Sequence, residues 1–351
     1  MTRITTRLTG VMTGLRSLPK ADLHLHQEMS PRLDRVLAKR ENRAGYDWAS
    51  WRRSLLDEIP PGIERLDNLS KVFPVARELD AEDDLFVARV VDTLTEAAED
   101  GACFVEVRFG NETVVREDFM GLFRQAEAEA RRRYPALRAE AVVTVVQFLA
   151  PDRLTRVVEG CVEAAAEGLA GIDLLYQPYH VEADWKQAYA LAERFAAVGL
   201  GITAHAGEFS TANIAAAART PGLTRIGHGV HAAADPALMG LLADRKITLE
   251  CCLTCNRLLG AIDEYPEHPL RRLLDHGVRV VLGTDNPVQV GTTIGKEYEA
   301  AAALGCDLDD LLRFTRTALE VGFTTEPRRR RMLAEFDLGY SALIATERSQ
   351  V

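Results

Sequence analysis

Short apolar segments rich in β-branched residues alternate along the chain with longer amphipathic segments rich in alanine and charged residues. The short segments predict eight buried strands, at 21–26, 102–109, 139–147, 171–176, 199–206, 224–229, 246–252 and 278–285. Helical periodicity predicts helices between them, at 83–100, 116–133, 151–168 and 185–199. This alternation is typical of a parallel sheet, and eight strands predict an α/β fold closed into a (β/α)8 TIM barrel.

The connection between the first two predicted strands is too long for a single barrel repeat, because it runs from residue 27 to residue 101. Trp48, Trp51 and Phe73 give this stretch enough apolar surface to fold as helices. We therefore expect residues 1–351 to form one hydrolase barrel domain, with a helical insertion at 30–82 lying as a lid over the barrel mouth. Helical decoration beside the barrel fits the same composition.

Composition narrows the class of partner. The chain has 351 residues with 47% hydrophobic content, a formal net charge of −10 and a pI near 5.4. An acidic chain of this kind argues against a nucleic-acid partner, which normally needs a concentrated basic face.

The N-terminal segment lacks the apolar run of a signal peptide and no later run could span a bilayer, so we expect a cytoplasmic enzyme with a small-molecule substrate and no membrane partner. Six irregularly spaced cysteines predict reduced thiols, and oligomeric state is left open.

Four polar residues end the predicted strands. His24 and His26 alternate in ADLHLH and so face the same side of one strand, although this triplet alone fits buried core histidines equally well. His205 ends GLGITAHA, and Asp285 follows VRVVLGT, where an uncompensated carboxylate would be costly to bury. Since the carboxyl ends of barrel strands meet at one face, three histidines and an aspartate predict a divalent-metal site.

Two further residues suit proton transfer. Glu208 follows His205 after a glycine that can turn the backbone, which makes it the best general acid/base of the chain. His228 lies between glycines in RIGHG and is the better candidate to polarise the attacking water, while His231 is interpreted as a loop or helix-start residue. These residue types together predict a hydrolase.

Two other patterns receive structural interpretations. Cys252 and Cys255 have CxxC spacing, but neither a helix start nor a second cysteine pair is indicated, so structural thiols are expected. Glu106 and Arg108 alternate onto one side of the second strand and could form a buried ion pair inside the barrel.

The motifs LPKADLHLH, FVEVR, HAGE, RIGHG and GTDNP, in this order, resemble the adenosine deaminase family of metal-dependent amidohydrolases from Leu18 to about Leu333. The resemblance implies a (β/α)8 barrel that holds one Zn2+ per chain, or another divalent metal, through His24, His26, His205 and Asp285. It also implies that Glu208 passes a proton to a substrate ring nitrogen and that His228 orients the attacking hydroxide. The expected reaction replaces an exocyclic amine by oxygen and releases ammonia.

Substrate-side positions depart from the family pattern. Gln27, Glu28 and Met29 stand where the family reads Leu-Asp-Gly, whose aspartate is associated with the ribose. Tyr176 and Gln177 fall in the segment where a family glycine lies against the purine, and Asn286 replaces a second aspartate that faces the purine's five-membered ring. We therefore expect Glu28, Met29, Tyr176, Gln177 and Asn286 to bind a purine nucleoside or related aminated heterocycle other than adenosine itself.

Two alternatives belong to other classes. An amidohydrolase that opens a cyclic amide or imide would use the same metal but give a ring-opened product without free ammonia. A non-catalytic protein that binds a nucleoside-like ligand would have no need of the metal and acid/base positions.

Overall fold

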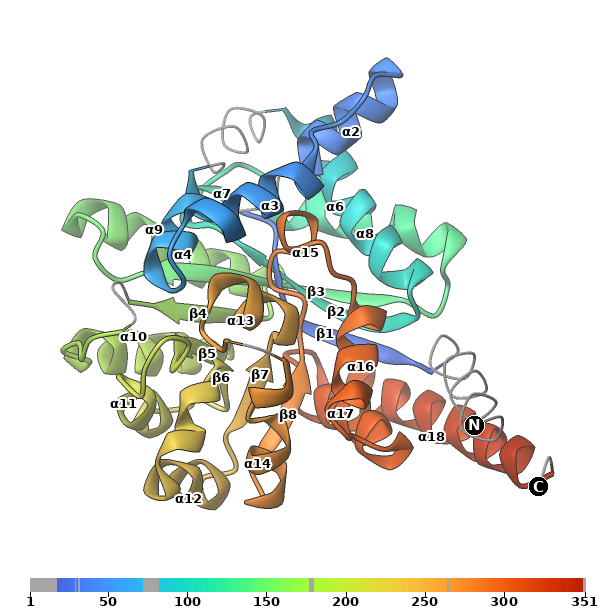
Figure 1. The fold of residues 1–351 in the computed structure, drawn as a ribbon. Helices are drawn as coiled ribbons and strands as arrows, with labels where there is room; N and C mark the ends of the chain where they lie inside the picture. Colours follow the sequence, from blue (N-terminus) through green and yellow to red (C-terminus); the bar gives the residue numbers. More distant parts are fainter. Residues whose placement is uncertain are drawn as a thin grey trace.

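The computed structural model describes residues 18–28, 30, 32–71, 82–176, 180–263 and 265–349. Its eight strands are parallel and pair in chain order around a barrel (Figure 1). They are β1 (Lys20–His26), β2 (Ala102–Phe109), β3 (Arg138–Val146), β4 (Gly171–Leu175), β5 (Gly201–Ala206), β6 (Arg225–His228), β7 (Thr248–Cys251) and β8 (Arg279–Leu282). The predicted TIM barrel is confirmed.

The barrel joins β1 to the segment after β8 beside the strand-end histidines. The His26 amide donates to the Asp285 carbonyl at 2.8 Å, and the Asp285 amide donates to the His24 carbonyl at 2.6 Å. These backbone bonds fix Asp285 next to both histidines.

Helices follow the strands and cover the outside of the barrel (Figure 1). They are α6 (Asp83–Glu99), α7 (Asn111–Val114), α8 (Phe119–Arg133), α9 (Pro151–Ala166), α10 (Lys186–Ala197), α11 (Ile214–Arg219), η1 (Val230–Ala234), α12 (Pro236–Asp244), α13 (Leu253–Leu259), η2 (Tyr265–Glu267), α14 (Leu270–Asp275), α15 (Pro287–Val290), α16 (Ile294–Ala303), α17 (Leu308–Val321) and α18 (Glu326–Ser349). Sequence dictates several of their starts: Asp235 caps α12 ahead of Pro236, and Asp307 with Asp310 forms a capping box at α17. Within the described ranges, no helix is long and apolar enough to cross a bilayer.

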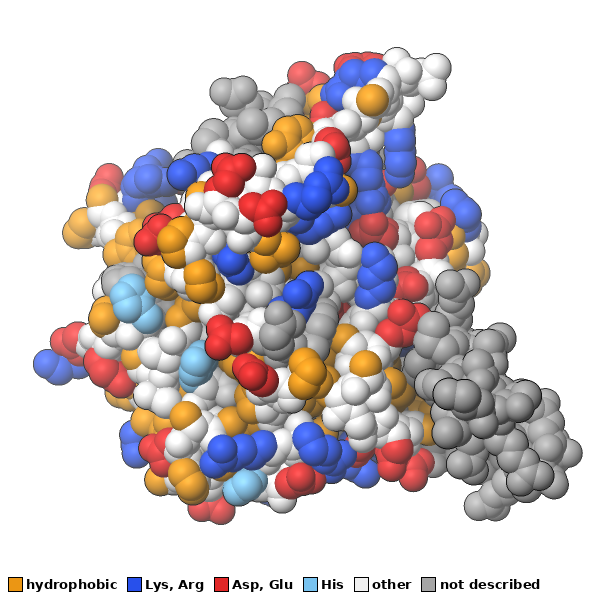
Figure 2. All heavy atoms as spheres, in the orientation of Figure 1, with side chains coloured by type: hydrophobic (Ala, Val, Ile, Leu, Met, Phe, Trp, Pro, Cys, Tyr) orange, Lys and Arg blue, Asp and Glu red, His pale blue; other side chains and the backbone are white. Residues whose placement is uncertain are grey.

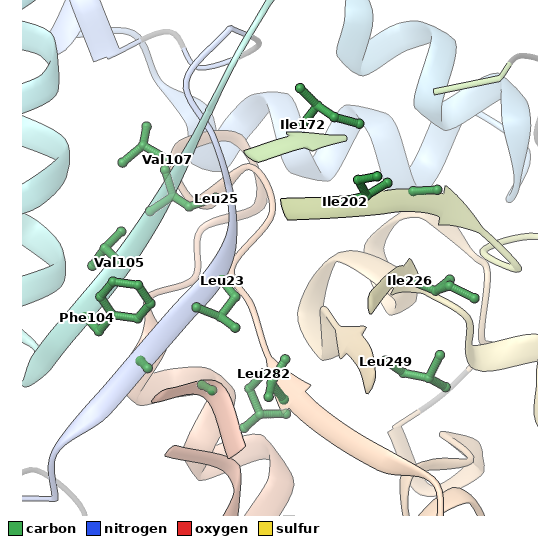
Figure 3. Close-up of a cluster of buried hydrophobic side chains, with 14 of the residues drawn as sticks. Leu23, Leu25, Phe104, Val105, Val107, Ile172, Ile202, Ile226, Leu249 and Leu282 are labelled. Atoms are coloured by element: carbon green, nitrogen blue, oxygen red, sulfur yellow. The ribbon is translucent and has the colours of Figure 1, made fainter. Parts of the chain in front are cut away.

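The alternation of β1 divides its side chains between two environments. Leu23 and Leu25 join the buried apolar cluster, together with residues such as Phe104, Ile172 and Leu249 of other strands (Figure 3). Asp22, His24 and His26, at the intervening positions, are equally buried but polar. The barrel interior therefore carries charged and titratable groups that must satisfy one another.

The amino-terminal end of the barrel is filled by Phe323. A Cβ added to Gly171 or Gly201 would lie 2.3 or 2.1 Å from its ring, so these strand starts must be glycine for the ring to fit. The guanidinium of Arg225 stacks on the same ring, 3.6 Å from its centroid. The closed end leaves the carboxyl-terminal end as the working face.

The segment inserted after β1 forms α2 (Arg32–Glu41), α3 (Trp48–Glu58) and α4 (Ile63–Ser70), as the composition predicted. Arg52 donates to the carbonyls of Val288 and Gln289 after β8, and the Gly62 amide donates to Leu259 after β7 at 2.6 Å. A second apolar cluster joins these helices to the same loops; its buried members are Leu55, Leu69, Cys252, Cys255, Leu258, Leu259 and Val290. Phe73 falls outside the described residues, and both the single-domain assignment and the lid remain predictions.

Acidic and basic side chains are interspersed on the face drawn in Figure 2.

Candidate active site

Four histidines from three strands meet at the carboxyl end of the barrel. The ring centroid of His24 lies 5.0 Å from that of His26, 4.7 Å from that of His205 and 4.8 Å from that of His228. All four residues are buried, with exposures of 5% or less. Residues 2 to 204 positions apart in the chain are thus brought together because barrel strands end on one face.

Three of these rings turn the same nitrogen toward a common point. Nε2 of His26 lies 3.1 Å from Nε2 of His24 and 3.3 Å from Nε2 of His205. Oδ1 of Asp285 lies 3.5 Å from the same atom of His26. Two ligands of a tetrahedral Zn2+ with Zn–N bonds of about 2.0–2.1 Å are separated by about 3.3 Å, so these donors fit a divalent cation.

The opposite nitrogen of each ring faces a carboxylate. Nδ1 of His24 lies 2.9 Å from Oε2 of Glu250, and Nδ1 of His26 lies 2.8 Å from Oε1 of Glu28. Nδ1 of His205 lies 2.8 Å from Oδ2 of Asp173. A carboxylate at Nδ1 keeps the proton there and leaves Nε2 free to bind a metal, the arrangement common around metal-binding histidines.

Glu250 and Asp173 were not identified from the sequence. Each is a single acidic residue inside an otherwise apolar strand, in TLEC and GIDLL, and both are fully buried. A lone carboxylate in a buried strand needs a partner, which was the available signal.

The predicted pairing of Glu106 with Arg108 is wrong. Both side chains face the barrel interior, but Glu106 pairs with Arg225, whereas Arg108 reaches Asp173 and Glu250. Residues two apart on one strand point the same way, and partners across the barrel offer closer approach.

Glu208 lies beside the histidine cluster with its side chain almost fully buried. Its Oε2 is 3.6 Å from Nε2 of His228, and its Oε1 has no hydrogen-bond partner within the described part of the chain. Burial disfavours the charged form and the nearby Asp285 carboxylate adds repulsion, so the pKa of Glu208 is raised well above its ordinary value. A buried, protonated carboxyl group can donate a proton.

His228 and Asp285 both adopt left-handed backbone conformations, with φ of 63° and 60°. Such conformations are uncommon outside glycine and cluster at functional sites. Burial lowers the pKa of His228 to about 3, so its imidazole is neutral. Although burial opposes ionisation of Asp285, the neighbouring His26 and His228 lower the pKa of its carboxyl group.

Among the expected substrate-binding residues, Glu28 and Asn286 lie next to the cluster. Oε1 of Glu28 accepts hydrogen bonds from His26 and Thr144, and its Oε2 is buried without a partner among the described residues. Nδ2 of Asn286 donates to Oδ1 of Asp285 at 2.6 Å, while its own Oδ1 is likewise buried and unpartnered there. Each therefore offers one spare acceptor.

Tyr176, also expected to bind substrate, lies directly after β4. Its hydroxyl donates to the Asp184 carbonyl at 2.9 Å, and its ring packs 5.2 Å from that of Trp185. These contacts hold it in the loop after β4 and do not reach the histidines. Met29 and Gln177 fall outside the described residues.

The CxxC pair was not expected to lie at a helix start, but Cys252 is the N-cap of the short helix α13. Both thiols are nonetheless free, and burial raises their pKa values well above the ordinary value, so neither is an activated thiolate. Cys255 lies near the acid/base residues, with its Sγ within 4.8 Å of carboxylate oxygens of Glu208 and Asp285.

His231 occupies the turn η1, where its Nε2 contacts the Ala261 carbonyl.

Comparison with known proteins gives a consistent family. Residues 19–338 match the family model described as adenosine deaminase. An adenine deaminase of Sinorhizobium medicae is 35% identical over 248 residues, which cover 69% of this chain and 76% of the relative. An adenosine deaminase of Enterococcus faecalis is 28% identical over 346 residues, covering 93% and 98% of the two chains.

Among solved structures, the chain resembles an amidohydrolase of Burkholderia ambifaria with bound zinc. The TM-score is 0.75 at 21% sequence identity, and the match covers 95% of this chain and 94% of the other. At this identity the likeness supports the barrel fold.

Proposed function

This chain belongs to the adenosine deaminase family, and we propose that it is a zinc-dependent hydrolase that converts a free 6-aminopurine base, adenine, into its 6-oxo product and ammonia. Hydrolytic deamination itself follows from the family and from the names of the relatives. The observation that carries the assignment to this site is the convergence of three Nε2 atoms next to the buried carboxyl group of Glu208.

His24, His26, His205 and Asp285 would hold the metal, one ion per chain. A bound Zn2+ would act as a Lewis acid and lower the pKa of water at the site toward about 7. The zinc seen in the amidohydrolase of similar fold supports this choice of ion.

Glu208 would supply the proton that the reaction needs. When water adds to the amine-bearing carbon, the adjacent ring nitrogen gains electron density and becomes basic. The unpartnered Oε1 of Glu208 could deliver its proton to that nitrogen. The resulting carboxylate could take one proton from the attacking water and pass it to the departing amine, so that ammonia leaves as a neutral molecule. It could then take the second proton of that water as the oxo group forms, which restores the carboxyl group. Burial and the nearby Asp285 carboxylate raise the pKa of Glu208, which favours the protonated form that this role needs.

His228 would orient the attacking water. Its neutral ring accepts from Nδ2 of Asn256 at Nδ1, at 3.2 Å, and so carries its own proton on Nε2. That nitrogen faces Glu208 and Asp285, at 3.6 and 4.0 Å. A fixed donor there favours one direction of attack.

One substrate-side residue favours the free base over the nucleoside. Asn286, at the position associated with the five-membered ring, offers an acceptor oxygen while its amide nitrogen binds Asp285. An unsubstituted purine carries an N–H on that ring, whereas a nucleoside has none to donate. The 35% identical relative named an adenine deaminase supports the same choice.

The insertion at 30–82 would cover the bound base as a lid of the single domain. Its helices contact the loops after β7 and β8, which carry Cys255, Asn256 and Asn286. A closed mouth would exclude bulk water from the reacting atoms.

The test is ammonia release from adenine and adenosine by the full chain loaded with one equivalent of Zn2+, with product identified by mass spectrometry. Adenine is expected to be converted with the higher kcat/KM. Faster conversion of adenosine would refute the free-base assignment, and a ring-opened product without ammonia would refute deamination.

A further inference from the structure

Arg108 of β2 is fully buried beneath the histidine cluster and reaches three other strands. Its Nε donates to Oδ2 of Asp173 on β4 at 2.8 Å, and its Nη2 donates to Oε2 of Glu250 on β7 at 2.5 Å. Its Nη1 donates to the Leu23 carbonyl on β1 at 2.6 Å. One guanidinium thus spans the barrel interior.

The two carboxylate oxygens that bind Arg108 are the same ones that face the histidines. Oε2 of Glu250 is 2.9 Å from Nδ1 of His24, and Oδ2 of Asp173 is 2.8 Å from Nδ1 of His205. The third contact, at Leu23, holds the backbone directly before His24. Each contact of Arg108 therefore leads to a histidine whose Nε2 faces the cluster centre.

We propose that Arg108 is a positioning residue that sets the spacing and tautomer of His24 and His205 together, and so determines how tightly the site holds its divalent metal. This inference rests on the proposed function, because it takes those histidines to be metal ligands. The planar guanidinium fixes the direction of both carboxylates, so that each one faces the Nδ1 atom of its histidine.

A lysine at position 108 cannot reproduce these three contacts. An ammonium group is a compact charge without the fixed fork that reaches three acceptors in different directions. Arg108→Lys would keep the positive charge while releasing at least one of the three contacts. If charge alone mattered, this variant would behave as the wild type does.

Arg225 provides a matched comparison inside the same network. It is also fully buried, and its Nε binds Glu250 at 2.7 Å, but through Oε1, the oxygen that does not face His24. Its other hydrogen bonds go to Glu106 and the Val321 carbonyl, and its guanidinium stacks on the ring of Phe323. Arg225→Lys therefore removes a guanidinium that is as deeply buried as that of Arg108. It leaves the contacts of Asp173 and of the Glu250 oxygen that faces His24 in place.

The experiment compares full-length wild type, Arg108→Lys, Arg108→Gln and Arg225→Lys. Zn2+ affinity is measured by competition with a chromophoric chelator, and the Co2+-substituted proteins are compared by their visible absorption spectra. Both Arg108 variants are expected to bind Zn2+ about 10–100-fold more weakly and to show an altered Co2+ spectrum. The loss for Arg225→Lys is expected to be smaller than that for Arg108→Lys.

Asp173→Asn and Glu250→Gln each change one of the two carboxylates that link Arg108 to a histidine. They replace the Arg108 variants in the test if an Arg108 variant fails to fold. Each is expected to weaken Zn2+ binding. Unchanged affinity and an unchanged Co2+ spectrum, with only a lower unfolding temperature of the metal-free protein, would overturn the positioning role in favour of simple structural support. Wild type that takes up no divalent metal would instead overturn the proposed function, and the inference with it.

Discussion

The amide nitrogen of Asn256 donates a hydrogen bond to Nδ1 of His228 at 3.2 Å, so one neutral side chain decides which nitrogen of that histidine carries the proton. With Nδ1 as acceptor, the proton lies on Nε2, which faces Glu208 at 3.6 Å and Asp285 at 4.0 Å. The residue that sets this tautomer lies on α13, after β7, and therefore acts on β6 from the neighbouring strand connection.

Replacement of Asn256 by aspartate should reverse the tautomer. A carboxylate at this position can only accept, so it would draw the proton to Nδ1 and raise the pKa of His228 above its value of about 3. We expect kcat to fall by about 100-fold or more. The Zn2+ content should stay unchanged, because Nδ2 of Asn256 contacts His228 and none of the proposed metal ligands. The measurement is kcat against pH alongside metal analysis. Asn42→Asp, the same change at an exposed residue, serves as the control.

Glu208→Gln should abolish most turnover while leaving the metal in place. Glutamine keeps the size of the side chain but has no acidic proton to deliver, and loss of a general acid costs about 100- to 10,000-fold in rate. Because the pKa of Glu208 is raised, wild-type turnover that depends on this acid should decline at a higher pH than an ordinary carboxyl group would give. Single-turnover assays with metal-content measurement test both points; substantial activity in the metal-loaded variant would exclude Glu208 as the acid.

Removal of the metal should lower both activity and stability. A ligand that binds only the folded state stabilises it in proportion to RT ln(1 + [L]/Kd), so the unfolding temperature should rise with added Zn2+. His24→Ala should lose most of this Zn2+-dependent rise, whereas His276→Ala, at an exposed position outside the cluster, should keep it. An unfolding temperature of wild type that does not respond to chelation or to Zn2+ would contradict a metal site.

Much of the architecture could be predicted because barrel strands and helices leave strong periodic signals. The polar residues in β1 and after β5 and β8 were visible as exceptions at the ends of apolar runs, and the fold brought them together as expected. The carboxylates that face the Nδ1 atoms of His24 and His205 could not be assigned from the sequence. Asp173 and Glu250 each occur alone in a strand, and their partners lie on other strands. Side-chain pairing across a barrel depends on relative strand position, which local patterns do not encode.

The loop after β4 shows the same limit. The hydroxyl of Tyr176 donates to the Asp184 carbonyl and its ring packs against Trp185, contacts that the strand pattern does not encode, and its role in substrate binding stays a prediction. The conformation of a loop after a strand depends on such local contacts more than on the register of the strand itself.

Glu297 gives a pH-dependent contribution to stability. It is fully buried in the first turn of α16, where it accepts from Thr292 and the Thr254 amide, and burial raises its pKa to about 7. Because the folded state holds this proton more tightly than the unfolded state, with its pKa of about 4.3, folding stability is lost as the pH rises between these values.

Glu297→Gln should remove that loss. Between pH 5 and 8, the free energy of unfolding of wild type should fall relative to the variant by about 1–3 kcal/mol, as measured by urea unfolding of the metal-free proteins. Glu299→Gln, on the same helix, should give parallel curves for mutant and wild type. A wild-type curve that runs parallel to that of Glu297→Gln would show that Glu297 does not titrate in this window.

Asn286 should control the preference between free base and nucleoside. Its Nδ2 is bonded to Asp285, which leaves an acceptor oxygen suited to the N–H of an unsubstituted five-membered ring. An aspartate at 286 would be pushed toward its protonated form by burial beside Asp285, and its O–H could then donate to a ring nitrogen that has no hydrogen. We expect Asn286→Asp to lower kcat/KM for adenine and to raise the adenosine-to-adenine ratio about 10-fold. Tyr176→Phe, which removes only the hydroxyl bonded to Asp184, should leave the ratio unchanged, and equal ratios in wild type and Asn286→Asp would remove Asn286 from substrate recognition.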